Sequence, residues 1–180
     1  MLSLRLILIA AAVAALPFAQ AAEAGSSESD VPGDIRVEAG NKAFLTGHAV
    51  GVQAYSCNAT AGGYAWVGTP SADLYGDNGK LIATHFGGPS WQATDGSRVV
   101  GQRMAGVTVD RTALPWLLLS AASRYAGEDG DRLAHTTFIQ RLATTGGLPP
   151  AAGDCNASTA GTRVEVPYTA DYVFWKGTGA

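Results

Sequence analysis

The chain contains few charged residues: Asp, Glu, Lys and Arg make up 15% of its 180 residues, and the formal net charge is −3. The sequence has no basic stripe of the kind that neutralises nucleic-acid phosphates, so we do not expect a nucleic-acid partner. The motifs G-x-S-x-G, H-E-x-x-H and G-x-G-x-x-G are missing, as are a P-loop and an EF-hand. We therefore predict no cofactor and no metal site, and the sequence leaves open whether the protein is an enzyme.

The one long apolar run, Leu6–Phe18, lies near the N-terminus and follows a positive charge at Arg5. The next residues, Ala19-Gln20-Ala21, have the A-x-A spacing of a secretory cleavage site. Because the run is shorter than the roughly 20 residues that cross a bilayer, we interpret residues 1–22 as a signal peptide rather than an anchor. We predict a secreted or periplasmic protein with no membrane span after removal of the signal.

The remainder of the chain has the length of one domain with a single hydrophobic core. Residues 23–34 are rich in Ser, Gly, Glu and Asp and contain few apolar side chains, which predicts a flexible leader. We assign residues 35–180 to one β-rich domain.

The chain has only two cysteines, Cys57 and Cys155. Because an exported chain meets an oxidising compartment, we predict a disulfide between them. In the chain-entropy model, closing this loop of about 100 residues lowers the conformational entropy of the unfolded chain and so stabilises the fold by roughly 4–5 kcal/mol. The alternative is a reactive thiol or a metal-binding pair, but neither CxxC spacing nor a histidine close in the sequence favours it.

Apolar and polar residues alternate with a period of two through much of the domain, which is typical of strands buried on one face. Turn sequences at residues 76–79 and 94–97 separate neighbouring strand segments into hairpins. Residues 114–122 are ambiguous between a buried strand and a helix, and we favour the strand. The pattern predicts an all-β fold, an antiparallel β-sandwich or a barrel-like fold, with at most one short helix.

Several short motifs resemble the DUF3455 family of exported bacterial and fungal proteins. They run in order from about residue 45 to about residue 175: Gly51–Cys57, His85–Trp91, Pro115–Leu118, Ile139–Leu142 and Pro167–Tyr172. The resemblance implies no catalytic residues, because the family has no assigned activity. Some fungal relatives carry a malate dehydrogenase label, which this sequence contradicts because it has neither a G-x-G-x-x-G motif nor a βαβ pattern.

Residues of several kinds are candidates for binding a ligand. His85 precedes a Gly-Gly-Pro loop where the backbone can approach a ligand closely, and tryptophans beside glycines can present flat rings to a sugar. Asp95 and Asp171 are possible acid and base groups, although a turn contact for Asp95 and an ion pair for Asp171, with a residue such as Arg141, are simpler interpretations. The complete set is His85, Trp91, Asp95, Arg141, Asp171 and Trp66.

Two functional hypotheses follow from these residues. We favour a non-catalytic, envelope-associated protein that binds a glycan or another small-molecule ligand, because catalytic motifs are missing and aromatic side chains are plentiful. The alternative is a hydrolase or metal-dependent enzyme centred on His85, with Asp95 and Arg141 as its partners.

Overall fold

The computed structural model describes residues 31–179, so the predicted signal peptide and residues 23–30 of the predicted leader lie outside the described residues. Two single-turn 3-10 helices, η2 (Gly33–Ile35) and η3 (Ala152–Asp154), accompany eight strands. No helix in this part of the chain is long and apolar enough to cross a membrane. The strands are β1 (Asn41–Thr60), β2 (Gly63–Tyr75), β3 (Leu81–Phe86), β4 (Ser90–Ala93), β5 (Arg98–Val107), β6 (Trp116–Tyr125), β7 (Thr136–Gly146) and β8 (Arg163–Gly177).

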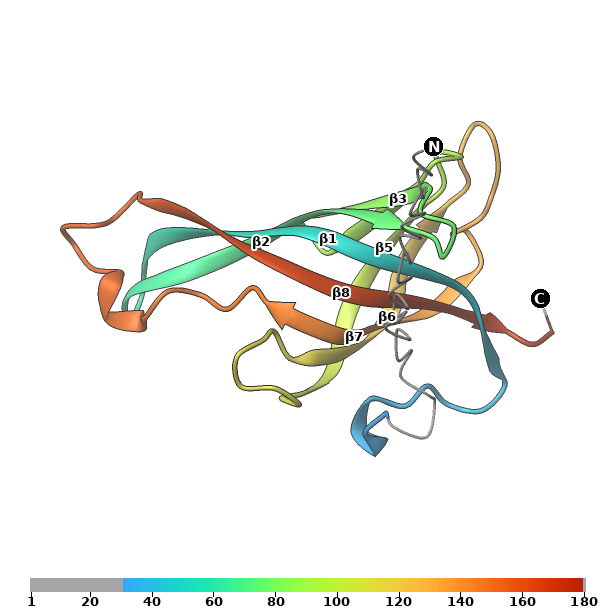
Figure 1. Cartoon of the computed structure of the whole chain (residues 1–180), viewed down its shortest axis with the longest axis horizontal. Coiled ribbons are helices and arrows are strands. Elements are labelled where there is room, and N and C mark those ends of the chain that lie inside the picture. Colours follow the sequence, from blue (N-terminus) through green and yellow to red (C-terminus); the bar gives the residue numbers. More distant parts are fainter. Residues whose placement is uncertain (1–30, 180) are drawn as a thin grey trace, which may run out of the picture.

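The eight strands form one antiparallel sheet that closes on itself. Each strand pairs with the next one along the chain, and β8 returns to pair with β1 (Figure 1). Closure removes free sheet edges, which would otherwise be left with unpaired backbone groups. The predicted all-β antiparallel fold is confirmed, and of its two architectures the structure is the barrel. The ambiguous apolar run lies mostly in β6, a strand, as predicted.

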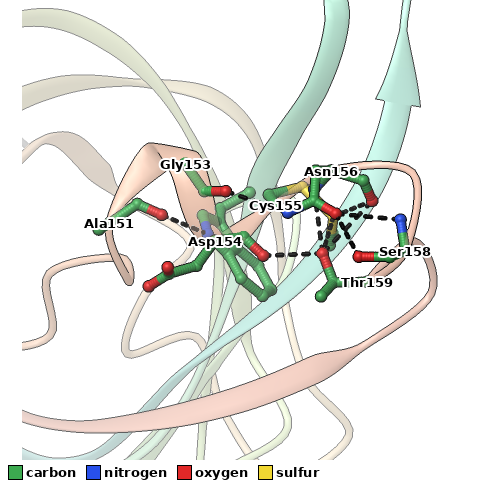
Figure 2. The surroundings of a disulfide bond; sticks show 9 residues. Ala151, Gly153, Asp154, Cys155, Asn156, Ser158 and Thr159 are labelled. Carbon is green, nitrogen blue, oxygen red and sulfur yellow. Dashed lines mark hydrogen bonds between the residues drawn. A yellow bond between two sulfur atoms is a disulfide. The ribbon is translucent and has the colours of Figure 1, made fainter.

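Strands β1, β2 and β8 extend beyond the others and form an arm at one end of the barrel (Figure 1). The predicted disulfide lies on this arm and joins Cys57 of β1 to Cys155 in the β7–β8 connection, with a Cα–Cα distance of 5.3 Å. Hydrogen bonds hold the connection around it, including one from the Thr159 hydroxyl to the Asp154 carbonyl at 2.7 Å (Figure 2). The disulfide therefore ties the β7–β8 connection to β1 on the arm.

The period-two alternation divides the barrel residues between two environments. Side chains facing inward form most of the main core, whose largest fully buried members are Trp91, Tyr172, Phe174, Leu74, Leu133 and Ile139. A second cluster lies on the outside, where Val31 and Ile35 pack against Leu118 of β6 and Leu142 of β7. Residues 31–34 of the predicted leader thus include a side chain, Val31, that is only 4% exposed.

Candidate ligand-binding pocket

A cavity of about 200 Å³ lies inside the barrel, at the end from which the arm extends. Its position follows from strand direction, because the β3–β4 turn and the start of β6 lie at the same end of an antiparallel barrel as the β1–β2 hairpin. Every strand supplies at least one lining residue. The lining residues from the strands are Gln53, Pro70, His85, Trp91, Arg103, Leu117, Leu119, Arg141 and Tyr172, and Pro89 comes from the β3–β4 turn.

Aromatic rings form the floor of this pocket. The rings of His85 and Trp91 are stacked, with centroids 4.4 Å apart, and Tyr172 meets them at centroid distances of 4.9 and 5.3 Å. Cross-strand pairing of His85 with Trp91 brings the first two together. Gly101 leaves room for the indole, because a Cβ atom there would lie 3.0 Å from Trp91 Cζ3. The floor is therefore a closely packed surface rather than a set of mobile side chains.

His85 is a buried, neutral imidazole. Its Nδ1–H donates a hydrogen bond to the Ser90 carbonyl at 2.8 Å, which leaves Nε2 as the unprotonated nitrogen. Burial lowers the pKa of His85 to about 4, and the nearby charge of Arg141 acts in the same direction, whereas the bond to Ser90 opposes the shift. At neutral pH this residue can accept a hydrogen bond through Nε2 but does not carry a positive charge.

Two arginines supply the charge of the pocket. Arg141 is half-buried, and its Nε and Nη2 atoms both donate to the Pro115 carbonyl, at 3.1 and 2.9 Å. Arg103 is exposed at the rim. Within residues 31–179 neither guanidinium forms an ion pair with a carboxylate. The charge of Arg141 also lowers the pKa of Tyr172, although burial is the larger influence and the net shift is upward.

The indole N–H of Trp91 has no hydrogen-bond partner. Trp91 is 1% exposed, and its Nε1 is the one fully buried side-chain nitrogen or oxygen in residues 31–179 that lacks a partner. Buried polar groups in folded proteins are nearly always hydrogen-bonded, and an indole nitrogen can only donate. The floor of the pocket therefore contains a buried donor that no acceptor in residues 31–179 satisfies.

Three of the six predicted site residues, His85, Trp91 and Arg141, meet in this pocket. Asp95 lies in the β4–β5 turn, at the opposite end of the barrel, where it accepts hydrogen bonds from the Ser97 backbone and hydroxyl and from the Arg132 backbone. Burial alone would raise the pKa of Asp95, but these hydrogen bonds outweigh it and lower the pKa. Asp95 thus occupies the turn role that was its simpler interpretation.

The other two candidates lie outside the barrel. Trp66 is on the arm, where its Nε1 donates to the Ala151 carbonyl at 3.2 Å. Asp171 accepts a hydrogen bond from His48 Nδ1 at 2.7 Å, so the ion pair with Arg141 considered above is wrong. The reason is alternation along β8: Tyr172 faces inward beside Arg141, and the adjacent Asp171 faces outward.

His48 and Asp171 belong to a second hollow of about 660 Å³ on the outer surface. His48 Nε2 also contacts Asp77 of the β2–β3 turn at 3.0 Å, so the imidazole bridges two carboxylates. These contacts, with Asp77 as the larger influence and Asp171 next, raise the pKa of His48. Within residues 31–179 no three His, Cys, Asp or Glu side chains are arranged to hold one metal ion.

Sequence reasoning missed three polar residues of the inner pocket, namely Gln53, Arg103 and Tyr172. Gln53 and Tyr172 lie within motifs that resemble the family, but nothing local distinguishes them from neighbours on the opposite face. Their convergence depends on the register of β1, β5 and β8 around the closed sheet.

Comparison with known proteins gives one match. A family model described as a protein of unknown function (DUF3455) matches residues 38–176, which span the barrel from just before β1 almost to the end of β8. No curated protein and no solved structure matches the chain.

Proposed function

The chain belongs to the DUF3455 family, and we propose that it is an exported binding protein that holds a small organic ligand in the pocket at the open end of the barrel. The observation that carries the proposal is a cavity lined by all eight strands, whose floor includes Trp91 with its buried and unpartnered indole N–H. Ligand pockets combine apolar walls with a few fixed polar groups, and barrels place such pockets at their mouths.

The volume of the pocket supports a ligand of modest size. About 200 Å³ corresponds to the share of about seven liquid water molecules, which suits a compound built on one ring. The rings of Trp91 and Tyr172 are buried in the floor, so the pocket favours an enclosed compound over an extended glycan lying on an open aromatic surface.

The enzymatic alternative requires His85, Asp95 and Arg141 to act on one substrate. His85 and Arg141 line the pocket, but Asp95 is bound into a turn at the other end of the barrel. The low pKa of His85 also keeps the imidazole neutral, which disfavours it as a general acid near pH 7. These placements favour binding over the proposed hydrolase.

Ligand-observed NMR with a library of one-ring compounds tests the binding proposal. The wild-type chain should bind members of the library, and Leu117→Trp, which places a bulky ring in the pocket, should abolish their binding while the variant stays folded by circular dichroism. Binding that is equal in both chains, or no binding at all, would contradict the proposal.

Export is supported by the N-terminal sequence and is compatible with the disulfide. It is tested by expressing the full chain in a bacterial host, separating cell fractions and determining the mass of the product. The expected product lies outside the cytoplasm and begins near residue 22. A product that keeps Met1 and stays in the cytoplasm would refute this part of the proposal.

A further inference from the structure

We propose that the ligand of the barrel pocket is an organic carboxylate whose charged group is held by Arg141 and Arg103. This inference rests on the proposed function, since it names the ligand class of the same site. It follows from three features of the pocket: its charge, its hydrogen-bonding groups and its walls.

The charge of the pocket has one sign. Arg103 and Arg141 line it, and the lining set contains no Asp or Glu. His85 is neutral, and burial keeps the pKa of Tyr172 above its ordinary value, so the phenol does not ionise near pH 7. The positive charge of Arg141 acts on other buried phenols as well, since it opposes the burial-driven rise in the pKa of Tyr55 and Tyr168.

The position of Arg141 makes an anion favourable. A half-buried guanidinium has lost part of its hydration, and within residues 31–179 the hydrogen-bond partners of Arg141 are uncharged, namely the Pro115 carbonyl and the Tyr172 phenol. A carbonyl oxygen does not neutralise a full charge, whereas a carboxylate does, and it matches the planar guanidinium fork with two oxygens. Arg103 at the rim offers a second cation to the same anion.

The hydrogen-bonding groups of the pocket are mainly donors. Both guanidinium groups are donors only, and Trp91 adds the buried N–H that lacks a partner. A carboxylate is an acceptor only and provides several lone pairs. An ammonium ligand would instead be repelled by the two arginines, and its N–H groups would face donors rather than acceptors.

The apolar walls indicate what the carboxylate is attached to. Leu117 and Leu119 of β6 and two prolines, Pro70 and Pro89, complete the lining around the aromatic floor. Together with the volume, they favour a single aromatic or alicyclic ring. The inferred class is therefore a small ring-bearing carboxylic acid, bound as its anion.

Isothermal titration calorimetry with matched acids and amides tests the inference. The probes are benzoate, phenylacetate and cyclohexanecarboxylate, each paired with its primary amide, at pH 7 and low salt. At least one acid should bind about tenfold or more tightly than its amide, because only the acid pairs with the arginines. Binding of that acid should weaken when salt is raised, because Arg103 is exposed to screening.

Three substitutions test the roles of the two arginines and control for a general effect of removing a charge. Arg103→Gln removes an exposed charged side chain and should weaken binding of the acid about fivefold or more, and binding of the amide by less. Arg163→Gln is the matched control, because Arg163 is an exposed arginine on the arm that pairs with Glu165 and does not line the pocket. Arg141→Lys keeps the positive charge but not the planar guanidinium group, and it should also weaken binding of the acid.

The outcomes distinguish the two proposals. If an amide binds as tightly as its acid, or if Arg103→Gln leaves acid binding unchanged, the anion inference is overturned while the binding pocket stands. If neither acids nor amides bind, and the compound library described above also fails, the binding function itself is overturned.

Discussion

The imidazole of His85 lies flat on the indole of Trp91, with ring planes only 5° from parallel. The two residues are cross-strand partners on β3 and β4, and both side chains face the inside of the barrel. Tyr172 and Phe174 from β8 pack against the indole of this pair, at centroid distances of 5.3 and 6.0 Å. The pair therefore joins the early and late parts of the barrel and forms the floor of the proposed ligand pocket.

The stability of the protein should fall in acid because of His85. Its pKa is 6.5 in an unfolded chain and about 4 in the fold, so the unfolded state binds the proton first. The neutral His85 therefore stabilises the fold fully above pH 6.5. This stabilisation is lost as the pH falls towards 4, and the total loss is about 3 kcal/mol of the free energy of unfolding. Urea unfolding between pH 4 and 7 measures it. His85→Gln should flatten the pH dependence over this interval, and an unchanged slope would refute the assignment.

Trp91→Ala should destabilise the protein by about 3–5 kcal/mol, because it leaves a cavity among packed rings. Trp91→Phe should reduce the stability by less than Trp91→Ala does, and it breaks no hydrogen bond within residues 31–179. Trp175→Phe is the control, since the Trp175 N–H donates to Gln140 at 2.9 Å on the outside of the barrel. Carboxylate binding should weaken in Trp91→Phe alone. Equal binding in both variants would argue against a ligand contact at Trp91 Nε1.

Asp95→Ala should reduce stability without affecting ligand binding. The substitution removes two hydrogen bonds from Ser97 within the β4–β5 turn and one from the Arg132 backbone that ties the turn to the rest of the fold, a loss of about 1–3 kcal/mol. Asp110→Ala is the matched control, because Asp110 makes the same two bonds to Thr112 but no third bond across the fold. Its loss of stability in thermal unfolding should be smaller. Impaired binding in Asp95→Ala would restore Asp95 as a site residue.

His48 should titrate above 6.5, because Asp77 and Asp171 both favour its protonated form. Its stabilising contribution is therefore present below pH 6.5 and is lost as the pH rises through the raised pKa. Asp77 is the larger influence on the pKa, but its side chain is 93% exposed and screened by water, against 26% for Asp171. We expect NMR titration to show that Asp171→Asn lowers the pKa of His48 at least as much as Asp77→Asn. A larger effect from Asp77→Asn would show that screening is weak there.

Replacing both cysteines by serine should lower the free energy of unfolding by about 4–5 kcal/mol. The disulfide closes a loop with a sequence separation of 98 residues, so its loss releases much unfolded-state freedom. Urea unfolding of the double variant against the oxidised wild-type chain measures the change. A difference below about 1 kcal/mol would mean that the arm does not unfold together with the barrel.

The strand pattern of β7 shows how far sequence reasoning reaches. Alternation over residues 133–143 predicts a strand with Ile139 and Arg141 on one face and Gln140 and Leu142 on the other, and these residues do lie in β7. The pattern does not tell which face is inside, because both are partly buried: Arg141 lines the pocket, and Leu142 packs beneath Val31 and Ile35. The register shift between Leu142 and Thr145 has no local signal either.

The candidate site was predictable only where its residues are close in the sequence. His85 and Trp91 stand close in the sequence on either side of a glycine-rich turn, so their proximity is a local property. Arg141 joins them only because β7 pairs with β8 and brings Arg141 beside Tyr172. Arg103 lines the same pocket from β5, a strand that none of the motifs covers.

From the sequence alone one can derive the all-β antiparallel fold, the turns and the pairing of the two cysteines, because alternation, turn chemistry and a cysteine count of two are local or unique features. Only the tertiary structure decided that the sheet closes as a barrel, that Asp171 pairs with His48, 123 residues away, and that Arg141 faces the pocket. The physical reason is that a side chain's face depends on the register between distant strands, and a shift of one residue exchanges inside for outside.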